Sequence, residues 1–284
     1  MCSILACNYS APSWSPRVYC TYTYNASGIF WHVNHLDLSG CNTGGSQPFE
    51  PQISRLTGLN SLYLRNMNVS VSTAPAAYSA LTLLNSLSFF NSNLTGPIPD
   101  AYSALKRLTY LEFSSNRFTG TLPASFSALT LLDNLGFAMN PIGSALPDQW
   151  STLNRLRGIN AWGLSSGGGG LSGTLPSSWA NMTRLQYLVL DTSHMAGRLP
   201  DAWSSLTALS FLGLSPEGLC PTPNTLHHGI PDAWFSSLTN LRYLRVMDGC
   251  GSSTPPLPAP SIPPSVGGLT KLVSFVYSTG LADR

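Results

Sequence analysis

Four aspartates recur at one position of a repeated sequence motif, each directly after a proline. They are Asp100, Asp148, Asp201 and Asp232. Paired carboxylates can act as general acid and general base in hydrolysis. These carboxylates return once per motif, where a short helical turn is expected to begin, and there a short acidic side chain caps free backbone N–H groups. We therefore predict caps and no catalytic pair.

The other residues that could do chemistry form no catalytic constellation. None of the histidines has the spacing of a metal site such as H-E-x-x-H, and we expect the adjacent His227 and His228 to lie in a solvated loop. The histidines are His32, His35, His194, His227 and His228. The segment "SSGGGG" at 165–170 lacks the Lys-Ser/Thr of a phosphate-binding loop. The sequence predicts no enzyme, no cofactor and no metal.

A large apolar side chain recurs in the same motif, as in "LPDAWSSL" at Leu199–Leu206. We call this series the packing spine; it consists of Ile53, Tyr78, Tyr102, Phe126, Trp150, Trp179, Trp203, Trp234 and Val266. Exposed tryptophans can stack on sugars, but Ile53 and Val266 cannot replace them in that role. We therefore predict a buried ladder, in which large aromatic side chains contribute most of the apolar area.

Composition favours a secreted chain over a nucleic-acid or membrane binder. Charged residues are 9% of the 284 residues and the net charge is +2, whereas typical soluble domains contain about 25% charged residues. No apolar run is long enough to span a bilayer. The opening "MCSILACNYS" is not an intact signal peptide, so we expect a mature or partial product. Five N-x-[ST] sequons favour glycosylation at Asn8, Asn25, Asn68, Asn93 and Asn181.

Self-similarity is the strongest signal in the chain. Nine segments begin with an apolar residue that is followed by apolar positions three, six and eight residues later. They start at Leu56, Leu81, Leu105, Leu129, Leu153, Met182, Leu206, Leu238 and Leu269, with spacings of 25, 24, 24, 24, 29, 24, 32 and 31 residues. Each segment reads as a short strand, a turn and about one turn of helix. Stacked repeats of this kind share one continuous core.

The segment "LTLLNSLSFFNSNLTGPIPDAYSA" resembles the plant-type leucine-rich repeat, LxxLxxLxLxxNxLxGxIPxxLxx. The 24-residue period and the segments "TGPIP", "TGTLP" and "SGTLP" carry the resemblance, which covers roughly Leu36 to the C-terminus. Receptor-kinase ectodomains, polygalacturonase-inhibitor proteins and trypanosomatid surface antigens share this repeat. The resemblance implies an α/β repeat solenoid, a right-handed superhelix with a parallel concave β-sheet and with turns and short 3₁₀ helices on the convex side.

The resemblance also implies a domain organisation. We expect residues 1–55 to form a cysteine-containing cap with the first strand, and residues 56–284 to form about nine repeats without a C-terminal cap. Further chain or another subunit would then cover the last repeat. Insertions at 165–170, 219–228 and 252–261 are expected to be surface loops. The asparagine that satisfies the turn in the family is present only as Asn116 and Asn140, so we expect irregular turns elsewhere.

The cysteines are expected to form disulfides. They are Cys2, Cys7, Cys20, Cys41, Cys220 and Cys250. The first four allow three pairings, of which we favour Cys7–Cys20 together with Cys2–Cys41. Cys220 and Cys250 lie in adjacent repeats, whose strands are expected about 5 Å apart, so a bridge between them would tie two insertions together.

The concave face is the predicted binding surface. Positions five, seven and nine after each repeat start point away from the core. From these positions we select Tyr63, Phe90, Tyr110, Glu112, Trp162, Tyr187, Asp191, Phe211, Tyr243 and Arg245. Exposed aromatic residues with arginine are the usual anchors of binding surfaces. Gly136, Ala138 and Gly213 are expected to leave room for a ligand.

Two functions fit these expectations. The first is a secreted or cell-surface glycoprotein without enzymatic activity that binds a protein, peptide or glycan on its concave face. The second is a structural component of an extracellular wall, sheath or surface filament. In that case copies of the chain or other surface glycoproteins would pack against the open last repeat.

Overall fold

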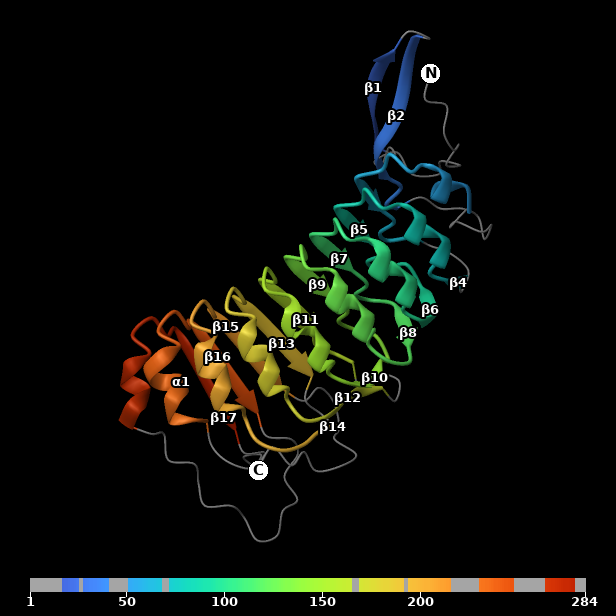
Figure 1. The fold of residues 1–284 in the computed structure, drawn as a ribbon. Helices are drawn as coiled ribbons and strands as arrows, with labels where there is room; N and C mark the ends of the chain where they lie inside the picture. The colour runs from blue at the N-terminus through green and yellow to red at the C-terminus, as the bar shows by residue number, and fades with distance from the viewer. Residues whose placement is uncertain are drawn as a thin grey trace.

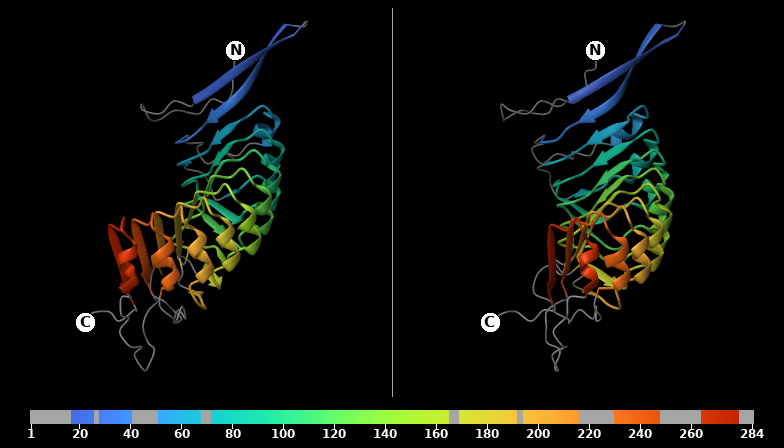
Figure 2. Two further views of the ribbon diagram at one scale, coloured as in Figure 1. Left: turned by 60° about the vertical axis from the view of Figure 1, so that its left-hand side comes forward. Right: turned by 90° about the vertical axis from the view of Figure 1, so that its left-hand side faces the viewer.

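The structure is a computed structural model, and it describes residues 17–25, 28–40, 51–67, 72–164, 169–191, 194–215, 230–247 and 264–278. Short strands and short helices alternate along these residues and stack in chain order, from blue to red in Figure 1. The stack bends into an arc, with the long sheet on the inside and the helices along the outside (Figure 2). The predicted repeat solenoid is therefore confirmed.

The main sheet has eleven strands in the described part of the chain. They are β1 (Arg17–Asn25), β2 (Gly28–Asp37), β3 (Ser61–Tyr63), β5 (Ser86–Ser88), β7 (Tyr110–Glu112), β9 (Asn134–Gly136), β11 (Gly158–Ala161), β13 (Tyr187–Asp191), β15 (Phe211–Ser215), β16 (Tyr243–Met247) and β17 (Ser274–Ser278). From β3 onward each strand begins five residues after one of the nine repeat starts. All neighbours from β2 to β17 pair in parallel, because each connection crosses the outside of the stack before the next strand begins.

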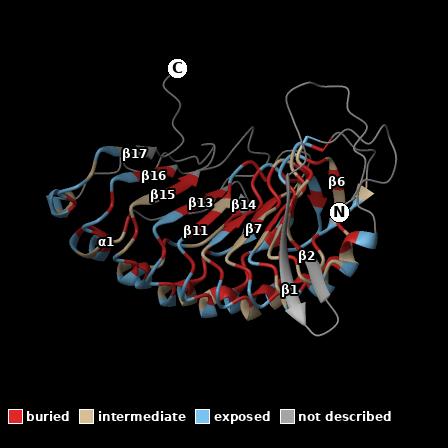
Figure 3. Ribbon diagram, turned by 90° about the horizontal axis from the view of Figure 1, so that it is seen from above, coloured by how far each residue is buried: buried red, intermediate tan, exposed pale blue. Residues whose placement is uncertain are grey.

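The repeat pattern accounts for the core. From the first repeat to the eighth, the apolar residues three, six and eight positions after each start are buried. Figure 3 shows buried residues recurring in every repeat along the stack. The ninth repeat is less covered, since Leu272 and Phe275 are only partly buried. One contiguous cluster of apolar side chains therefore runs through the solenoid.

An antiparallel hairpin precedes the repeats and was not foreseen from the sequence. β1 and β2 pair from Arg17↔Asp37 to Asn25↔Gly28, with an irregularity between Tyr19 and Cys20. β2 then pairs in parallel with β3, where His35 lies opposite Ser61. The hairpin extends beyond the first repeat at the blue end of Figure 1.

Two small parallel sheets flank the stack and were also unforeseen. One contains β4 (Ser72–Thr73), β6 (Leu94–Pro97) and β8 (Arg117–Thr119). The other contains β10 (Gly143–Ala145), β12 (Gly170–Gly173) and β14 (His194–Met195). They form where the segments after the main strands align from repeat to repeat, so backbone groups that leave the main sheet still find hydrogen-bond partners.

Each repeat closes with a short helix on the outside of the arc. In the described part of the chain, all eight 3₁₀ helices and the α-helix carry a residue of the packing spine, and the last of these, Val266 on η8, is only half-buried. They are η1 (Pro51–Arg55), η2 (Ala76–Ala80), η3 (Asp100–Ala104), η4 (Ala124–Ala128), η5 (Asp148–Thr152), η6 (Ser177–Asn181), η7 (Asp201–Ser205), α1 (Asp232–Ser237) and η8 (Pro264–Gly268). No helix in the described ranges is both long and apolar enough to cross a bilayer.

The predicted capping role of the aspartates is wrong. The N-cap residue of these helices is a proline, the aspartate is the first helical residue, and no side-chain cap hydrogen bond forms. Three of the carboxylates instead accept a hydrogen bond from a serine hydroxyl of the next repeat. The pairs are Ser125 to Asp100 at 2.8 Å, Ser178 to Asp148 at 2.8 Å and Ser265 to Asp232 at 3.1 Å. These aspartates link repeats on the outside of the arc.

The packing spine is buried as predicted. From Ile53 to Trp234 no member is more than 1% exposed. Trp150, Trp179, Trp203 and Trp234 stack with ring centroids 6.0–6.5 Å apart. Each of the four indole N–H groups donates to a proline carbonyl of the preceding repeat, at 2.9–3.0 Å. The spine therefore supplies both apolar contact and a hydrogen-bond ladder between repeats.

Asparagine satisfies the turns where the repeat pattern retains it. The Asn116 amide donates to the carbonyls of Phe89, Phe113 and Ser114. Its Oδ1 atom accepts from the N–H groups of Ser92 and Leu94 at 2.9 and 3.0 Å. One repeat earlier, the hydroxyl of Ser92 donates to the Leu64 carbonyl at 2.6 Å, so a smaller side chain takes over part of this role.

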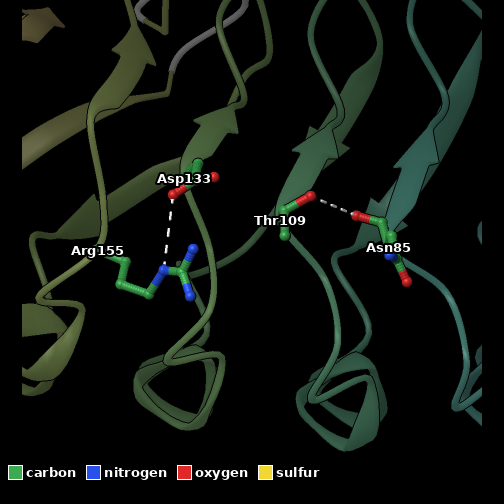
Figure 4. Close-up of polar contacts among 4 residues, drawn as sticks. All are labelled: Asn85, Thr109, Asp133 and Arg155. Atoms are coloured by element: carbon green, nitrogen blue, oxygen red, sulfur yellow. Dashed lines mark hydrogen bonds and ion pairs between the residues drawn. The ribbon is translucent and has the colours of Figure 1, made fainter.

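A further ladder aligns the repeats where the main strands begin. Asn85, Thr109 and Asp133 each directly precede a strand, and the backbone N–H of Thr109 donates to the Asn85 carbonyl at 2.8 Å. Figure 4 shows two added links: the Thr109 hydroxyl donates to the Asn85 carbonyl at 3.1 Å, and Arg155 Nε lies 4.0 Å from Asp133 Oδ1. These contacts help to fix the register of neighbouring strands.

Candidate functional site on the concave face

The register of the main sheet places the predicted site residues in columns. Tyr187, Phe211 and Tyr243 lie side by side in one column, and Val189, Gly213 and Arg245 lie side by side in the next. Towards the N-terminus, Tyr63, Ser88 and Glu112 continue the second column. The concave face therefore carries an aromatic end and a polar end, separated by β9 and β11.

The aromatic end consists of three contacting rings, which we call the aromatic row: Tyr187, Phe211 and Tyr243. The first two ring centroids lie 4.9 Å apart and the second two 5.6 Å apart. Tyr187 is 38% exposed and Tyr243 is 42% exposed, although both are large side chains on a folded sheet. Partial burial raises the pKa of the Tyr187 phenol. The row offers aromatic faces and two phenol groups to a partner.

Arg245 borders the aromatic row. Arg245 lies two residues after Tyr243 on β16 and is exposed. Asp191 ends β13 in register with Ser215. Val276, on the neighbouring strand β17, is 41% exposed and lies opposite Arg245. This end of the face is therefore mainly apolar with a guanidinium at its border.

The polar end is built by Tyr63, Arg65, Tyr110 and Glu112, which we call the polar cluster. The Arg65 guanidinium lies over the Tyr63 ring, 4.0 Å from the centroid. The Tyr110 hydroxyl donates to Glu112 Oε2 at 3.4 Å, and the Ser114 N–H donates to Glu112 Oε1 at 2.8 Å. Burial, and then the negative charge of Glu112, raise the pKa of Tyr110 to about 12, although Arg65 acts in the opposite direction.

The expectation that small residues leave room for a ligand is wrong: Ala138 is itself only 2% exposed, and the space at Gly136 and Gly213 is occupied. A side chain at Gly136 would collide with the carboxylate of Glu112, which lies over it. At Gly213 an added Cβ atom would lie 3.2 Å from the Phe211 ring and 3.4 Å from Val189. These glycines make space for neighbouring side chains of the chain itself.

Phe90 and Trp162, also selected from the sequence, lie apart from both groups. Phe90 follows β5 and is 38% exposed, and Trp162 follows β11 and is 36% exposed. They belong to repeats separated by β7 and β9. Of the ten selected residues, the fold therefore brings three together in the aromatic row and three in the polar cluster. The fourth member of the polar cluster, Arg65, was not among the selected residues.

Besides Arg65 Nε of the polar cluster, sequence reasoning missed two further buried polar atoms on this face. Ser88 Oγ and Asn160 Oδ1 have no hydrogen-bond partner in the part of the chain that the structure describes. Both residues lie in the column of Glu112, on β5 and β11. No sequence signal marks them, because their burial depends on which neighbouring side chains lie over them.

A polar cavity of about 430 Å³ lies at the turns that follow β3, β5 and β7. Its lining residues are Asn66, Met67, Asn91, Asn93, Ser115, Asn116 and Arg117. Asn66, Asn91 and Ser115 occupy equivalent positions and share a left-handed backbone with φ of 51–60°. The side chains of Asn91 and Asn66 are joined by a hydrogen bond of 3.0 Å. The cavity therefore lies beside the concave face, within the turns.

Several predicted sites cannot be read from the described residues. Cys2, Cys7, Cys41, Cys220 and Cys250 lie outside them, as do Asn8, Asn68, His227 and His228. Asn25 ends β1, Asn93 is half-buried in a turn, and Asn181 is exposed at the end of η6. Glycosylation and disulfide pairing stay predictions. Within the described ranges no three His, Cys, Asp or Glu side chains gather to hold a metal ion.

Comparison with known proteins identifies the repeat. A sequence model of the Leucine Rich Repeat family matches residues 107–129. Comparison with curated protein sequences finds no significant match. The Arabidopsis receptor kinase HAESA, solved with the peptide hormone IDA and the co-receptor SERK1, is 26% identical with a TM-score of 0.69, over 88% of this chain and 38% of that one. The chain therefore folds as a leucine-rich-repeat solenoid, and its resemblance to the plant-type repeat is confirmed.

Two further solved structures show the same architecture. The plant peptide hormone receptor RGFR1 in complex with RGF2 is 26% identical with a TM-score of 0.65, over 79% of this chain and 33% of that chain. A plant ice-binding protein is 23% identical with a TM-score of 0.58, over 81% of this chain and 67% of that chain, and shows the fold alone. This chain spans 33% and 38% of the two receptor chains.

Proposed function

We propose that this chain is a non-enzymatic recognition module that binds a peptide ligand on its concave face. The observation that carries the proposal is the aromatic row, three contacting rings of which two are more than one-third exposed. Large aromatic side chains contribute much contact area at a low cost in conformational entropy, and they dominate the energetics of binding surfaces. The peptide-hormone complexes of the similar receptors support the class of ligand.

The proposal includes an extracellular location. The similar receptor kinase HAESA was solved as its ectodomain, and the low charge and the sequons of this chain agree with passage through the secretory pathway. The aspartates do not support an enzyme, because Asp100, Asp148 and Asp232 lie in separate repeats and are each engaged by a serine hydroxyl. We therefore assign the exposed residues of the concave face to binding.

A peptide selection tests the proposal. A random peptide library displayed on phage is selected against the purified chain, and the affinities of the enriched peptides are measured by fluorescence anisotropy. We expect Tyr187→Ala, Phe211→Ala and Tyr243→Ala, combined in one variant, to abolish binding, because truncated hot-spot residues commonly cost about 2 kcal/mol or more each. The matched control is Leu131→Ala, which removes a side chain that is 37% exposed away from the aromatic row.

Two results would overturn the proposal. One is a library from which the wild-type chain enriches no peptide. The other is a triple variant that keeps its circular dichroism spectrum and still binds the selected peptides as the wild type does.

Assembly of copies into a surface structure is the second candidate. Its support is β17, which pairs only with β16 in the described part of the chain, beside Val273, which is 69% exposed. Exposed edge strands offer unpaired backbone groups to a further strand. Concentration-dependent association in sedimentation experiments that is lost in Val273→Lys would support assembly, and a monomer at all concentrations would contradict it.

A further inference from the structure

Glu112 is held in a fixed position on the concave face. Its two carboxylate oxygens accept from the Ser114 N–H at 2.8 Å and from the Tyr110 hydroxyl at 3.4 Å. The carboxylate lies over Gly136, at the place where any other residue would put a Cβ atom. The glycine at position 136 on β9 therefore leaves space for the Glu112 carboxylate, whose orientation on the concave surface is fixed by these contacts.

No described residue places a countercharge within ion-pair distance of this carboxylate. Among the residues that the structure describes, the ion pair that forms is Arg155 with Asp133, and Glu112 forms none. Arg65 belongs to the β3 repeat, two strands from β7, and its guanidinium lies on the Tyr63 ring. A carboxylate offers about four acceptor sites, so two hydrogen bonds leave Glu112 with acceptor capacity. A half-buried acid in this state attracts a cation from outside the chain.

Two polar atoms that find no hydrogen-bond partner among the described residues lie on both sides of Glu112 in the same column. Ser88 Oγ lies one strand before it and Asn160 Oδ1 two strands after it. A buried polar atom that lacks a hydrogen bond is costly, and the N–H and C=O groups of a peptide backbone can supply the missing partners once the covering side chains shift. Of the two, Asn160 lies between Glu112 and the aromatic row, and Ser88 lies on the other side of Glu112, next to Tyr63.

The distance between Glu112 and the aromatic row sets how far apart the two ligand groups that contact them must be. Three strand steps separate Glu112 on β7 from Tyr187 on β13, and five separate it from Tyr243 on β16. Neighbouring strands lie about 4.8 Å apart, so these steps correspond to roughly 14 and 24 Å. An extended peptide covers about 3.3–3.6 Å per residue, so roughly four to seven residues join the two ends.

We infer that Glu112 selects a cationic nitrogen of the ligand. The ligand is then an extended peptide with a cationic group at Glu112 and apolar side chains on the aromatic row, roughly four to seven residues away. The inference rests on the proposed function, because it names the chemistry of a ligand bound on the same face. The cation is the side chain of a lysine or arginine, or the α-amino group of the peptide, and both sources present the same chemistry to a carboxylate.

Charge reversal at Glu112 tests the inference. Random peptides of about 12 residues, long enough to span both ends, are selected separately against the wild-type chain and against Glu112→Lys. We expect basic residues to be enriched at a fixed separation from aromatic or aliphatic residues in the wild-type pool. At that position the Glu112→Lys pool is expected to carry aspartate or glutamate. The control Asp133→Lys reverses a charge that is already paired with Arg155. It is expected to enrich the same peptides as the wild-type chain.

Affinities of the selected peptides separate charge from position. Glu112→Gln is expected to weaken binding of wild-type peptides about tenfold or more, because it removes one partner of a close charge pair. Gly136→Ala keeps the charge but displaces the carboxylate, and it is also expected to weaken binding. Lys→Gln in the peptide and acetylation of its amino terminus are compared, and the change that reproduces the loss identifies the source of the cation.

The possible failures are distinguishable. The peptides selected by the wild type could bind Glu112→Lys and Glu112→Gln with affinities within about twofold of the wild-type value, yet fail to bind the triple variant of the aromatic row. In that case the inferred role of Glu112 is wrong and the proposed function stands. If the wild-type chain selects no peptide, the proposed function fails and the inference fails with it. Circular dichroism confirms that each variant is folded before it is used.

Discussion

At the scale of residues, Trp203 joins two repeats in two ways. Its ring is 1% exposed between Trp179 and Trp234, and its indole N–H donates to the Pro176 carbonyl at 2.9 Å. We predict that Trp203→Ala lowers the free energy of unfolding by about 3–5 kcal/mol, the usual cost of a buried large-to-small change. Urea denaturation followed by tryptophan fluorescence or circular dichroism measures it.

The control for that prediction is Leu131→Ala, which truncates a side chain that is 37% exposed. It is expected to stay within about 0.5 kcal/mol of the wild type. Similar losses of stability in the two variants would show that the packing spine does not hold the repeats together.

Tyr110 gives the polar cluster a measurable pH dependence. Its folded-state pKa of about 12 lies above the ordinary value of 10.0, because burial and the Glu112 charge disfavour the phenolate. The resulting stabilisation is fully present below pH 10 and is lost as the pH rises from about 10 to about 12. We predict that the free energy of unfolding of Tyr110→Phe falls less than that of the wild type as the pH rises from about 10 to about 12.

The ultraviolet absorbance of tyrosinate checks this prediction. The difference between the wild-type and Tyr110→Phe titrations isolates the Tyr110 phenol, and Glu112→Gln should lower its pKa because the nearby negative charge is gone. A Tyr110 phenol that titrates at its ordinary value in the wild type would mean that it is neither buried nor beside the Glu112 charge.

At the scale of elements, the turns after β5 and β7 depend on one buried side chain, that of Asn116. Asn116 hydrogen-bonds backbone groups of its own repeat, at Phe113, and of the one before it, at Ser92, Leu94 and Phe89. We predict that Asn116→Ala lowers the free energy of unfolding by about 1–3 kcal/mol, because buried backbone groups lose their partners. Hydrogen exchange at the amides of Ser92 and Leu94 is expected to accelerate. The exposed Asn154→Ala serves as the control, and equal exchange in both variants would contradict the prediction.

The positions of the strands and of the spine could be predicted, because both are set by apolar spacing within one repeat. The role of the aspartates could not, since the serines that engage Asp100 and Asp148 lie 25 and 30 residues further along the chain. The two small sheets were missed for a similar reason. Their strands have two to four residues and carry no periodic signal, because backbone alignment between repeats creates them.

The positions of the candidate site residues could be predicted from the sequence, but the space around them could not. The column of Tyr187, Phe211 and Tyr243 follows from equal positions in successive repeats, and the register places them side by side. The occupied space over Gly136 did not follow, because it depends on the direction in which Glu112 extends from the neighbouring strand. Spacing within a repeat thus fixes which face a residue lies on, and side-chain conformation decides what is left accessible.

At the scale of the whole molecule, the outer and inner surfaces of the arc have different roles. The outside carries the helices and the serine–aspartate links, and the buried spine behind them joins repeat to repeat. The inside carries exposed aromatic side chains and an acid without an ion-pair partner among the described residues. In a solenoid, stability is the sum of repeats and of their interfaces, so residues on the inner surface are free to serve binding.

Oxidative footprinting of the intact chain, with and without a selected peptide, tests this division most directly. We predict that the peptide slows oxidation of Tyr187 and Tyr243 on the inside. Leu131 and Met139, which are 37% and 46% exposed outside the aromatic row, should react at unchanged rates. A bound peptide that protects Leu131 and Met139 and leaves both tyrosines fully reactive would contradict recognition on the concave face.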